Sequence, residues 1–398
     1  MTFQSPAFQS IAPPLPDFVT ARMTDRVAPG TGQHRTRHIL GQDVPPVGAV
    51  MMQSNDYLGI ARDARISVAK SRALLRQGHG DSVSRVFAHH RADDHRRFER
   101  RMAHLIGAED SILCMSGYSA NVGLIQALAR PDTPIYIDKM AHASLWEGIQ
   151  SAGATPTVFR HNDVADLQDK IAAKGPGLII VDAIYSQNGN ICPLEDMVEV
   201  SEATGSALIV DETHSFGCHG RDGAGLCVAL GLQHRVHFRT IGLSKAVAAR
   251  GGIIAGSEEA MDFIRFEARP MIFSTSVLGY EVAGFNAVLD IMRSEPWRRT
   301  RLKDNHRMLR AGLTQIGYDV GDSDSQILSI VIGSDEDTIA FRKALVAEGV
   351  VGSVFCHPAV PRGKAMIRLT VSAVMGPDDI PQVLEAFDQL KDMPRLRA

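Results

Sequence analysis

Two residues that could do chemistry together, Asp211 and Lys245, stand where two apolar runs of the chain end. The first run covers residues 207–210 and leads into Asp211, and the second covers residues 236–243 and leads into Ser244 and Lys245. Such runs are typical of buried strands of a parallel sheet, and ligands bind at the carboxyl ends of those strands. A lysine that can form a Schiff base and an acid that can keep a pyridine nitrogen protonated together predict a pyridoxal 5'-phosphate (PLP) site.

Each residue also has an ordinary structural explanation. An acid at the end of a strand usually caps a helix or forms a turn, and a lone lysine after a strand is usually a solvated surface charge. Here the two occur together and glycines follow both, with Gly217 after Asp211 and Gly251 and Gly252 after Lys245. The combination is much rarer by chance than either residue alone, so the prediction is based on the pair.

The composition is that of an ordinary globular protein. The chain has 398 residues, 44% hydrophobic and 22% charged, which is enough for two domains or for one large domain with an appendage. A formal net charge of −3 gives no reason to expect nucleic-acid or membrane-surface partners. The five cysteines are scattered without a CxxC pair, and no long apolar run or signal-like N-terminus is present, so we expect a cytoplasmic protein.

The pattern of apolar runs predicts three regions. Residues 1–50 contain seven prolines and are expected to form an N-terminal arm with one helix near 16–26. Residues 51–296 alternate short apolar runs with helical patterns, which favours an α/β domain with a mostly parallel sheet. Residues 297–398 predict a smaller C-terminal α+β domain, entered by a long helical region that is interrupted near Pro296. The strands expected in the two domains cover residues 112–115, 135–138, 157–160, 178–182, 207–211, 236–243, 253–256, 327–332, 351–355 and 366–371.

A phosphate seat is predicted where the strand at 112–115 leads into the small-residue turn Ser116-Gly-Tyr-Ser-Ala-Asn121 and then into a helix. Unpaired backbone N–H groups and the positive end of the helix dipole would face an anion there. An ordinary strand-to-helix connection has the same sequence features, so by itself this stretch favours neither interpretation.

Eight short motifs occur in an order and at spacings that are specific to one family. They are Asn55-Asp-Tyr-Leu-Gly59, Ser116-Gly-Tyr-Ser-Ala-Asn121, His142-Ala-Ser144, Ser186-Gln-Asn-Gly189, Asp211-Glu-Thr-His-Ser215, Ser244-Lys245, Phe273-Ser-Thr275 and Arg368-Leu-Thr370. From Asn55 to the C-terminal helix, the chain resembles the α-oxoamine synthases, which are PLP enzymes of fold type I. Within that family, residues 142–148, 175–186 and 352–359 resemble the branch that makes α-hydroxyketone quorum-sensing autoinducers.

The resemblance implies a catalytic and cofactor-binding role for five residues. Lys245 would form the Schiff base with PLP and then remove the substrate's α-proton as general base. Asp211 would face the pyridine nitrogen, and His214 and Ser186 would lie near the cofactor's phenolic oxygen. His142 would stack on the face of the ring, although a lone histidine is more often a satisfied core or cap residue.

The resemblance also implies phosphate and substrate contacts. Backbone and side-chain donors of Gly117, Tyr118 and Ser119 would bind the phosphate. Ser274 and Thr275 match residues that reach the phosphate of a neighbouring subunit, which implies a homodimer with a shared active site. Arg368 matches the arginine that binds a substrate carboxylate through its planar fork, and Asn55 and Arg85 are weaker candidates for substrate contact.

One position departs from the family at the phosphate. The family usually has Thr or Ser three residues before the lysine as a phosphate ligand, and this chain has Gly242 there. Thr240 or Ser244 could compensate.

The activity that the resemblance implies is acyl transfer between carbon atoms. An acyl-CoA would condense with S-adenosylmethionine or 2-aminobutyrate to give an α-aminoketone, the precursor of a quorum-sensing signal. The alternatives are a glycine- or alanine-using relative of the 8-amino-7-oxononanoate or 5-aminolevulinate synthase type, a non-catalytic regulatory subunit, and, on fold grounds alone, a transaminase. The presence of Lys245 argues against the regulatory subunit.

Three further patterns suggest sites that the rest of the sequence does not support. The GxG spacing at 78–80 follows no apolar strand, which excludes a dinucleotide-binding turn. Residues 211–214 resemble a helicase box, but the chain has no GxxxxGK[ST] phosphate loop, which excludes an ATPase. The histidines and acids within 89–95 lie on an arginine-rich helical stretch without a paired cysteine, so we expect no metal site.

Overall fold

The computed structural model describes residues 13–27, 44–80, 83–87 and 92–393. The chain divides into two compact units, Met1–Val47 and Gly48–Ala398. In the first unit the described residues contain helix α1 (Asp17–Val27), which agrees with the helix expected near 16–26. The rest of the predicted arm, residues 1–12 and 28–43, lies outside the described residues.

A seven-stranded sheet forms the centre of the second unit, in the order β2-β8-β7-β6-β5-β3-β4. Its strands are β2 (Asp110–Cys114), β3 (Ile135–Asp138), β4 (Pro156–Phe159), β5 (Leu178–Asp182), β6 (Ala207–Asp211), β7 (Phe238–Gly242) and β8 (Gly252–Gly256). The five strands from β7 to β4 are parallel to one another, and β8 is antiparallel to both of its neighbours. The mostly parallel sheet predicted from the sequence is therefore confirmed.

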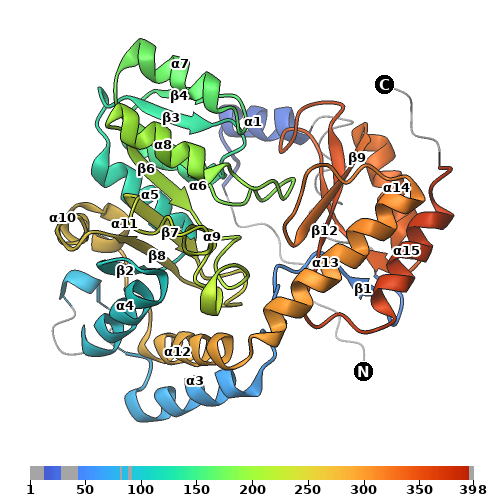
Figure 1. Cartoon of the computed structure of the whole chain (residues 1–398), viewed down its shortest axis with the longest axis horizontal. Helices are drawn as coiled ribbons and strands as arrows, with labels where there is room; N and C mark the ends of the chain where they lie inside the picture. The colour runs from blue at the N-terminus through green and yellow to red at the C-terminus, as the bar shows by residue number, and fades with distance from the viewer. Residues whose placement is uncertain (1–12, 28–43, 81–82, 88–91, 394–398) are drawn as a thin grey trace. The chain divides into compact units, whose positions relative to one another are not determined.

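Helices cover both faces of this sheet because successive strand residues point to opposite sides (Figure 1). Ile180 and Ile209 pack into a cluster shared with α5 and α6, whereas Ile179 and Leu208 pack into a second cluster shared with α7 and α8. The helices are α5 (Gly117–Leu128), α6 (Ala143–Ser151), α7 (Val164–Lys174), α8 (Leu194–Thr204), α9 (Leu226–Ala229), α10 (Glu258–Glu267) and α11 (Arg269–Ile272). Both faces of the parallel strands are buried, which explains why their sequences read as continuous apolar runs.

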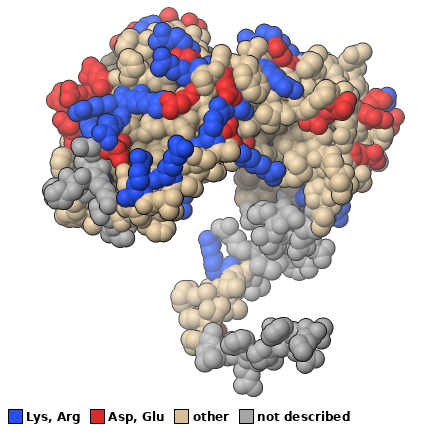
Figure 2. Space-filling model, turned by 90° about the horizontal axis from the view of Figure 1, so that it is seen from below, with Lys and Arg blue, Asp and Glu red and all other residues tan. Residues whose placement is uncertain are grey.

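The long helical region after the sheet forms two helices, α12 (Gly279–Ser294) and α13 (Trp297–Ile316), with Pro296 between them. Pro296 is the N-cap of α13, a position that tolerates the missing N–H of proline. Helix α3 (Ala64–Gln77) packs along α12, and α4 (Ala92–Ile106) precedes β2. Figure 2 views the face on which α3, α12 and α13 lie, and Lys and Arg side chains gather toward its middle.

The C-terminal region contains a three-stranded antiparallel sheet in the order β11-β12-β9. Its strands are β9 (Ile327–Gly333), β11 (Ser353–Phe355) and β12 (Ala365–Thr370), and its helices are α14 (Asp335–Ala347) and α15 (Asp379–Gln389). The short strand β1 (Val50–Met51) pairs in parallel with β10 (Val350–Val351), so the chain near residue 50 is joined to a segment about 300 residues later. A domain boundary at residues 296–297 stays a prediction.

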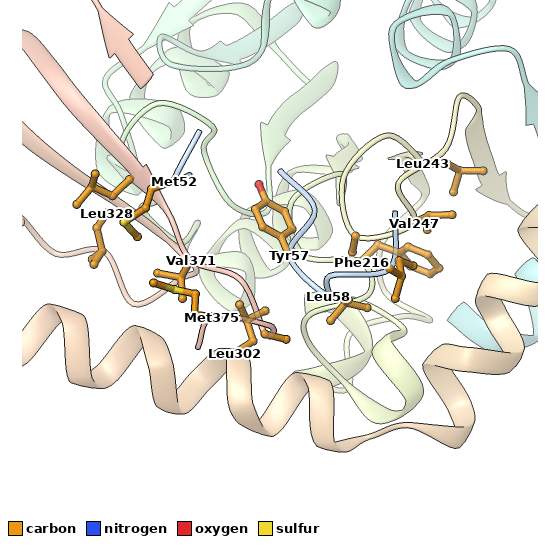
Figure 3. Packing of buried hydrophobic residues seen from close by; sticks show 14 of the residues in the cluster. Met52, Tyr57, Leu58, Phe216, Leu243, Val247, Leu302, Leu328, Val371 and Met375 are labelled. Carbon is orange, nitrogen blue, oxygen red and sulfur yellow. The ribbon is translucent and has the colours of Figure 1, made fainter. Parts of the chain in front are cut away.

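The segment from Met52 to Leu58 crosses from the C-terminal region to the large sheet. Figure 3 shows Met52 near Leu328 at one end and Leu58 near Phe216 at the other, with Tyr57 between them. Tyr57 is fully buried, and its hydroxyl points away from the surrounding apolar side chains. This segment therefore delivers Asn55 and Tyr57 to the end of the sheet where the polar strand ends lie.

Among the described residues, no helix is both long enough and apolar enough to cross a membrane. The same residues contain no group of three or more His, Cys, Asp and Glu that could hold a metal ion, and His89 and His90 lie outside them. All five cysteines are free thiols.

Candidate active site

A cavity of about 680 Å³ lies at the carboxyl ends of β5, β6 and β7, where the sequence predicted the site. Strand ends supply Asp182, Asp211 and Gly242 to its wall, and α5 and α6 begin beside it. The residues predicted for the site that line this cavity are Asn55, Gly117, Tyr118, His142, Asp211, His214, Ser244 and Lys245. The structure therefore brings together residues that are up to 190 positions apart in the sequence.

Asp211 is held by hydrogen-bond donors on both of its oxygens. It is 3% exposed, its Oδ2 accepts a bond of 2.7 Å from Asn121 Nδ2, and its Oδ1 accepts one of 2.8 Å from the backbone N–H of Thr213. Asn121 is oriented in turn by a second bond from its Nδ2 to Ser144 Oγ, 2.8 Å away. Donors alone surround the carboxyl oxygens in these contacts, which suits an ionised carboxylate that faces a cation.

Asp182 is the neighbour of Asp211 on the adjacent strand, and the two are directly in register. Burial, followed by repulsion from Asp211, raises the pKa of Asp182 well above its usual value. Its Oδ2 accepts a 3.0 Å bond from the backbone N–H of His142. Burial therefore disfavours the charged form of Asp182, whereas Asp211 has hydrogen-bond donors on both of its oxygens.

Lys245 follows β7 and is partly buried in the cavity wall. Burial, with a contribution from the positive charge of Arg368, lowers the pKa of its amine, while Asp211 partly opposes that shift. A lowered pKa leaves more of the amine unprotonated at neutral pH, and the unprotonated form is the nucleophile and the base.

His214 is buried in the wall of the cavity, and its Nδ1 forms a 2.5 Å hydrogen bond with Tyr57 Oη. Burial, followed by the charges of Lys245 and Arg368, lowers the pKa of His214 well below its usual value, so the ring is neutral. Burial raises the pKa of Tyr57, so its hydroxyl stays protonated and is able to donate to Nδ1. With Tyr57 as the donor, the proton of the neutral imidazole lies on Nε2, where His214 can donate a hydrogen bond.

The predicted phosphate seat is built by close backbone packing. A Cβ atom at Gly117 would lie 2.6 Å from the Cα atom of Gly242, so the first turn of α5 can meet the end of β7 only because Gly117 has no side chain. Ser116 caps α5: its Oγ accepts from the N–H of Ser119, and Ser119 Oγ accepts from the N–H of Ser116. The side chain and the amide of Ser119 are thus engaged in the cap, and its contact with a phosphate stays a prediction.

Thr213 supplies a hydroxyl beside Gly242. Its Oγ1 accepts a 2.7 Å bond from the N–H of Gly242, and a Cβ atom at Gly242 would lie 3.0 Å from Oγ1. Because an N–H group already occupies the oxygen as acceptor, the hydroxyl proton is available for an anion in the cavity. Thr240, one of the two residues expected to compensate, is buried and does not line the cavity, whereas Ser244 does.

Arg368 does not line the cavity itself but contacts Asn55, which does. It is 6% exposed, and its Nη2 donates a 2.6 Å bond to Oδ1 of Asn55, which lines the cavity. The Nε of Arg368 is buried without a hydrogen-bond partner, and burial lowers the pKa of the guanidinium. A buried guanidinium with an unused donor is suited to bind a substrate carboxylate.

The remaining predicted residues lie elsewhere in the single chain. Arg85, Ser274 and Thr275 line a second cavity of about 250 Å³, where Arg85 forms an ion pair of 3.4 Å with buried Glu99. Ser186 is partly buried just after β5 and lines neither cavity. Their roles at the cofactor and substrate stay predictions.

The sequence did not predict roles for Asn121, Thr213, Asp182 and Tyr57. Three of them lie inside motifs that were recognised: Asn121, Thr213 and Tyr57. Asp182 is the last residue of a predicted strand, and that position is the sequence feature that could have indicated its place in the site. Their partners come from other parts of the chain, and single-sequence patterns do not reveal such contacts.

The residues of the main cavity fit PLP by their chemistry. An acid held between donors suits a protonated pyridine, an amine of lowered pKa suits a Schiff base, and glycines at the N-terminus of α5 leave room for a phosphate.

The chain is similar to a consistent set of enzymes in sequence and fold. The family model for aminotransferase class I and II matches residues 49–387. The CAI-1 autoinducer synthase of Vibrio campbellii is 39% identical over 96% of this chain and 97% of its own length. The putative 8-amino-7-oxononanoate synthase of Halalkalibacterium halodurans is 35% identical over 85% of this chain and 86% of its own length. A high-resolution structure of SPT (serine palmitoyltransferase) with a PLP internal aldimine superposes with a TM-score of 0.81, at 30% identity over 86% of this chain and 87% of that one.

Proposed function

The chain belongs to the aminotransferase class I and II family as a PLP-dependent α-oxoamine synthase, and from that premise we propose the substrates that it joins. It condenses an acyl-CoA with S-adenosylmethionine or 2-aminobutyrate to give an α-aminoketone, the precursor of a quorum-sensing signal. The observation that supports this choice is the 39% identity to the CAI-1 autoinducer synthase over 97% of that enzyme. The motifs at 142–148 and 352–359 agree with it.

Bound PLP supplies an electron sink that stabilises negative charge on the carbon next to the substrate's amine. Asp211, fixed by Asn121 and Thr213, balances the positive charge of a protonated ring nitrogen. The amine of Lys245 takes the proton from the substrate carbon, because its lowered pKa keeps it available as a base.

The other residues of the cavity orient the reacting groups. His142 is exposed at the cavity and has its ring anchored by a 2.7 Å bond to Ser144 Oγ, which suits stacking against a flat ring. His214 donates from Nε2 while Tyr57 holds its other nitrogen. Arg368 and Asn55 bind the substrate carboxylate, and the free Nε of Arg368 provides the unused donor.

The test is a panel of amino donors offered to the purified, PLP-loaded enzyme together with a medium-chain acyl-CoA. We expect thiol release with S-adenosylmethionine or 2-aminobutyrate, and mass spectrometry of the product should show the matching aminoketone. Activity with glycine or alanine alone would instead identify an enzyme of the 8-amino-7-oxononanoate or 5-aminolevulinate synthase type. That alternative is kept because the Halalkalibacterium halodurans relative is named a putative 8-amino-7-oxononanoate synthase.

The same purified protein also distinguishes the two remaining alternatives, a non-catalytic regulatory subunit and a transaminase. A regulatory subunit would take up no PLP and release no thiol. A transaminase would convert its bound cofactor when offered a keto acid without an acyl-CoA, and the change would be visible in the absorption spectrum.

We also propose that the enzyme works as a homodimer with a shared active site. Ser274 and Thr275 lie away from the main cavity of their own chain. The side chain of the neighbouring Phe273 is 80% exposed, and that of Phe266 is 69% exposed. Large exposed aromatic side chains beside residues expected to act on a neighbouring site favour burial against a second copy. Sedimentation of the active, PLP-loaded enzyme should give twice the chain mass of 43.2 kDa, and an active monomer would contradict the proposal.

We place the enzyme in the cytoplasm, where a reducing environment keeps thiols free. All five cysteines are free in the structure, which supports this location. Cell fractionation that recovered the protein with extracytoplasmic markers would contradict it.

Thr213→Val is expected to weaken PLP binding about tenfold, because a methyl group replaces the hydroxyl that can donate to the phosphate. The measurement is the PLP dissociation constant of the apoenzyme from fluorescence quenching, together with the ³¹P chemical shift of the bound phosphate. Thr213→Ser keeps the hydroxyl and should bind PLP as the wild type does. If Thr213→Val binds PLP as the wild type does and Ser244→Ala binds it more weakly, Ser244 is the residue that donates to the phosphate.

A further inference from the structure

A third cavity, of about 440 Å³, is lined by residues of α13 and by residues of the segments after β6 and before β9. One wall is a face of α13, where Arg299, Lys303, His306 and Arg307 follow one another at helical spacing. The opposite wall includes His219 from the segment after β6, and the segment before β9 adds Asp324 and Gln326. Its lining is separate from that of the main cavity.

The charge of this lining is mainly positive. Arg299, Lys303 and Arg307 contribute three cations, and Asp324 is the one acid among the lining residues. Arg307 also has an ion pair of 3.2 Å with Asp304, but both side chains are more than half exposed, and such pairs are weak. Burial lowers the pKa of Arg299, and Asp222 partly opposes that shift.

A buried polar atom without a partner belongs to the same lining. His306 is 4% exposed, and its Nε2 has no hydrogen-bond partner in the structure. Buried polar atoms are paired in the great majority of cases, so an unpaired one beside a cavity indicates that the missing partner is bound in the cavity. Burial lowers the pKa values of His306 and His219, which favours their neutral forms, and a hydrogen bond with Gln326 partly opposes the shift at His219.

Gln326 connects this cavity to the active site. It lines the cavity, and its Nε2 donates a 2.6 Å bond to the backbone oxygen of His214. His214 itself lines the PLP cavity. A ligand that contacts Gln326 therefore acts one hydrogen bond away from a residue at the cofactor.

We propose that the cavity on α13 is a second binding site, for a small phosphate-bearing anion, and that its occupancy is transmitted to His214 through Gln326. Three cations and the unpaired Nε2 of His306 match the charge and the several acceptor oxygens of a phosphate group. The volume lies in the range of small-molecule pockets and exceeds what a phosphate ion alone fills, so a phosphorylated organic molecule fits as well as the free ion.

The test uses the PLP-loaded enzyme, so that the cofactor's own phosphate seat is filled. Isothermal titration in 150 mM NaCl with inorganic phosphate and, separately, with glycerol 3-phosphate should give one saturable site per chain, and the tighter probe distinguishes the free ion from an ester. Lys303→Gln should weaken binding at least tenfold, because Lys303 is exposed at the cavity and its loss removes one cation. Arg293→Gln removes the same charge from an exposed position outside the cavity and should bind as the wild type does. The absence of saturable binding by both probes, or equal weakening in both variants, would overturn the site.

Transmission to His214 is measured separately by the absorption spectrum of bound PLP. Saturating the site should shift that spectrum or its pH dependence in the wild type, and Gln326→Leu should bind the probe without the shift. A wild-type spectrum that does not respond at saturation would overturn the transmission while leaving the site. Thermal unfolding of each variant checks that it is folded, and none of these readouts depends on which substrates the enzyme joins.

Discussion

Lys245→Ala is expected to abolish turnover, with a loss of about 10⁴-fold or more, and to remove the covalent link to PLP. General-base catalysis alone contributes roughly 10²–10⁴-fold, and this variant loses the nucleophilic amine as well. Borohydride reduction of the wild type should attach the cofactor to the peptide that contains Lys245, as mass spectrometry can show. The variant should bind PLP only reversibly.

Lys70 provides a matched control, because it lines the same cavity from helix α3. Lys70→Ala should keep the reducible link and most of the activity. Labelling of Lys70 in the wild type, or a Lys245→Ala enzyme with more than about one-hundredth of wild-type turnover, would contradict the assignment of Lys245.

Asp211→Asn is expected to lower turnover by about 10²-fold or more, equivalent to roughly 3 kcal/mol of barrier, while the protein still folds and binds PLP. The amide keeps the shape of the carboxylate but cannot balance the charge of a protonated ring nitrogen, so the buried ring would lose its proton. Steady-state thiol release measures the turnover. The pH dependence of the cofactor's absorption reports the protonation state of the ring.

Asp182→Asn, on the adjacent strand, is the matched control for Asp211→Asn. Burial and repulsion from Asp211 raise the pKa of Asp182 well above its usual value, which favours its neutral form, and Asp182→Asn puts a neutral group of similar shape in its place. We expect this variant to lose less than tenfold. Similar losses in the two variants would show that the arrangement of the strand ends, and not the charge of Asp211, determines the rate.

The strand ends that carry the chemistry were predictable because local sequence determines them. The apolar runs before Asp211 and Lys245 form β6 and β7 within a few residues of the expected bounds. The break at Pro296 was predictable for the same reason, since proline cannot continue a helix from within. Strand β8 shows the limit: its run was recognised, but its antiparallel direction depends on which strands lie beside it.

The sequence by itself determined the identity of the reacting groups, because Asp211, Lys245 and the motifs around them are consecutive residues with a characteristic chemistry. Only the tertiary structure decided their state. Burial and Asp211 raise the pKa of Asp182, Thr213 places its hydroxyl next to Gly242, and Tyr57 forms a hydrogen bond with His214 from 157 residues away. The physical reason is that a pKa and a hydrogen-bond partner depend on burial and on groups from distant segments, and these are set only when the chain has folded.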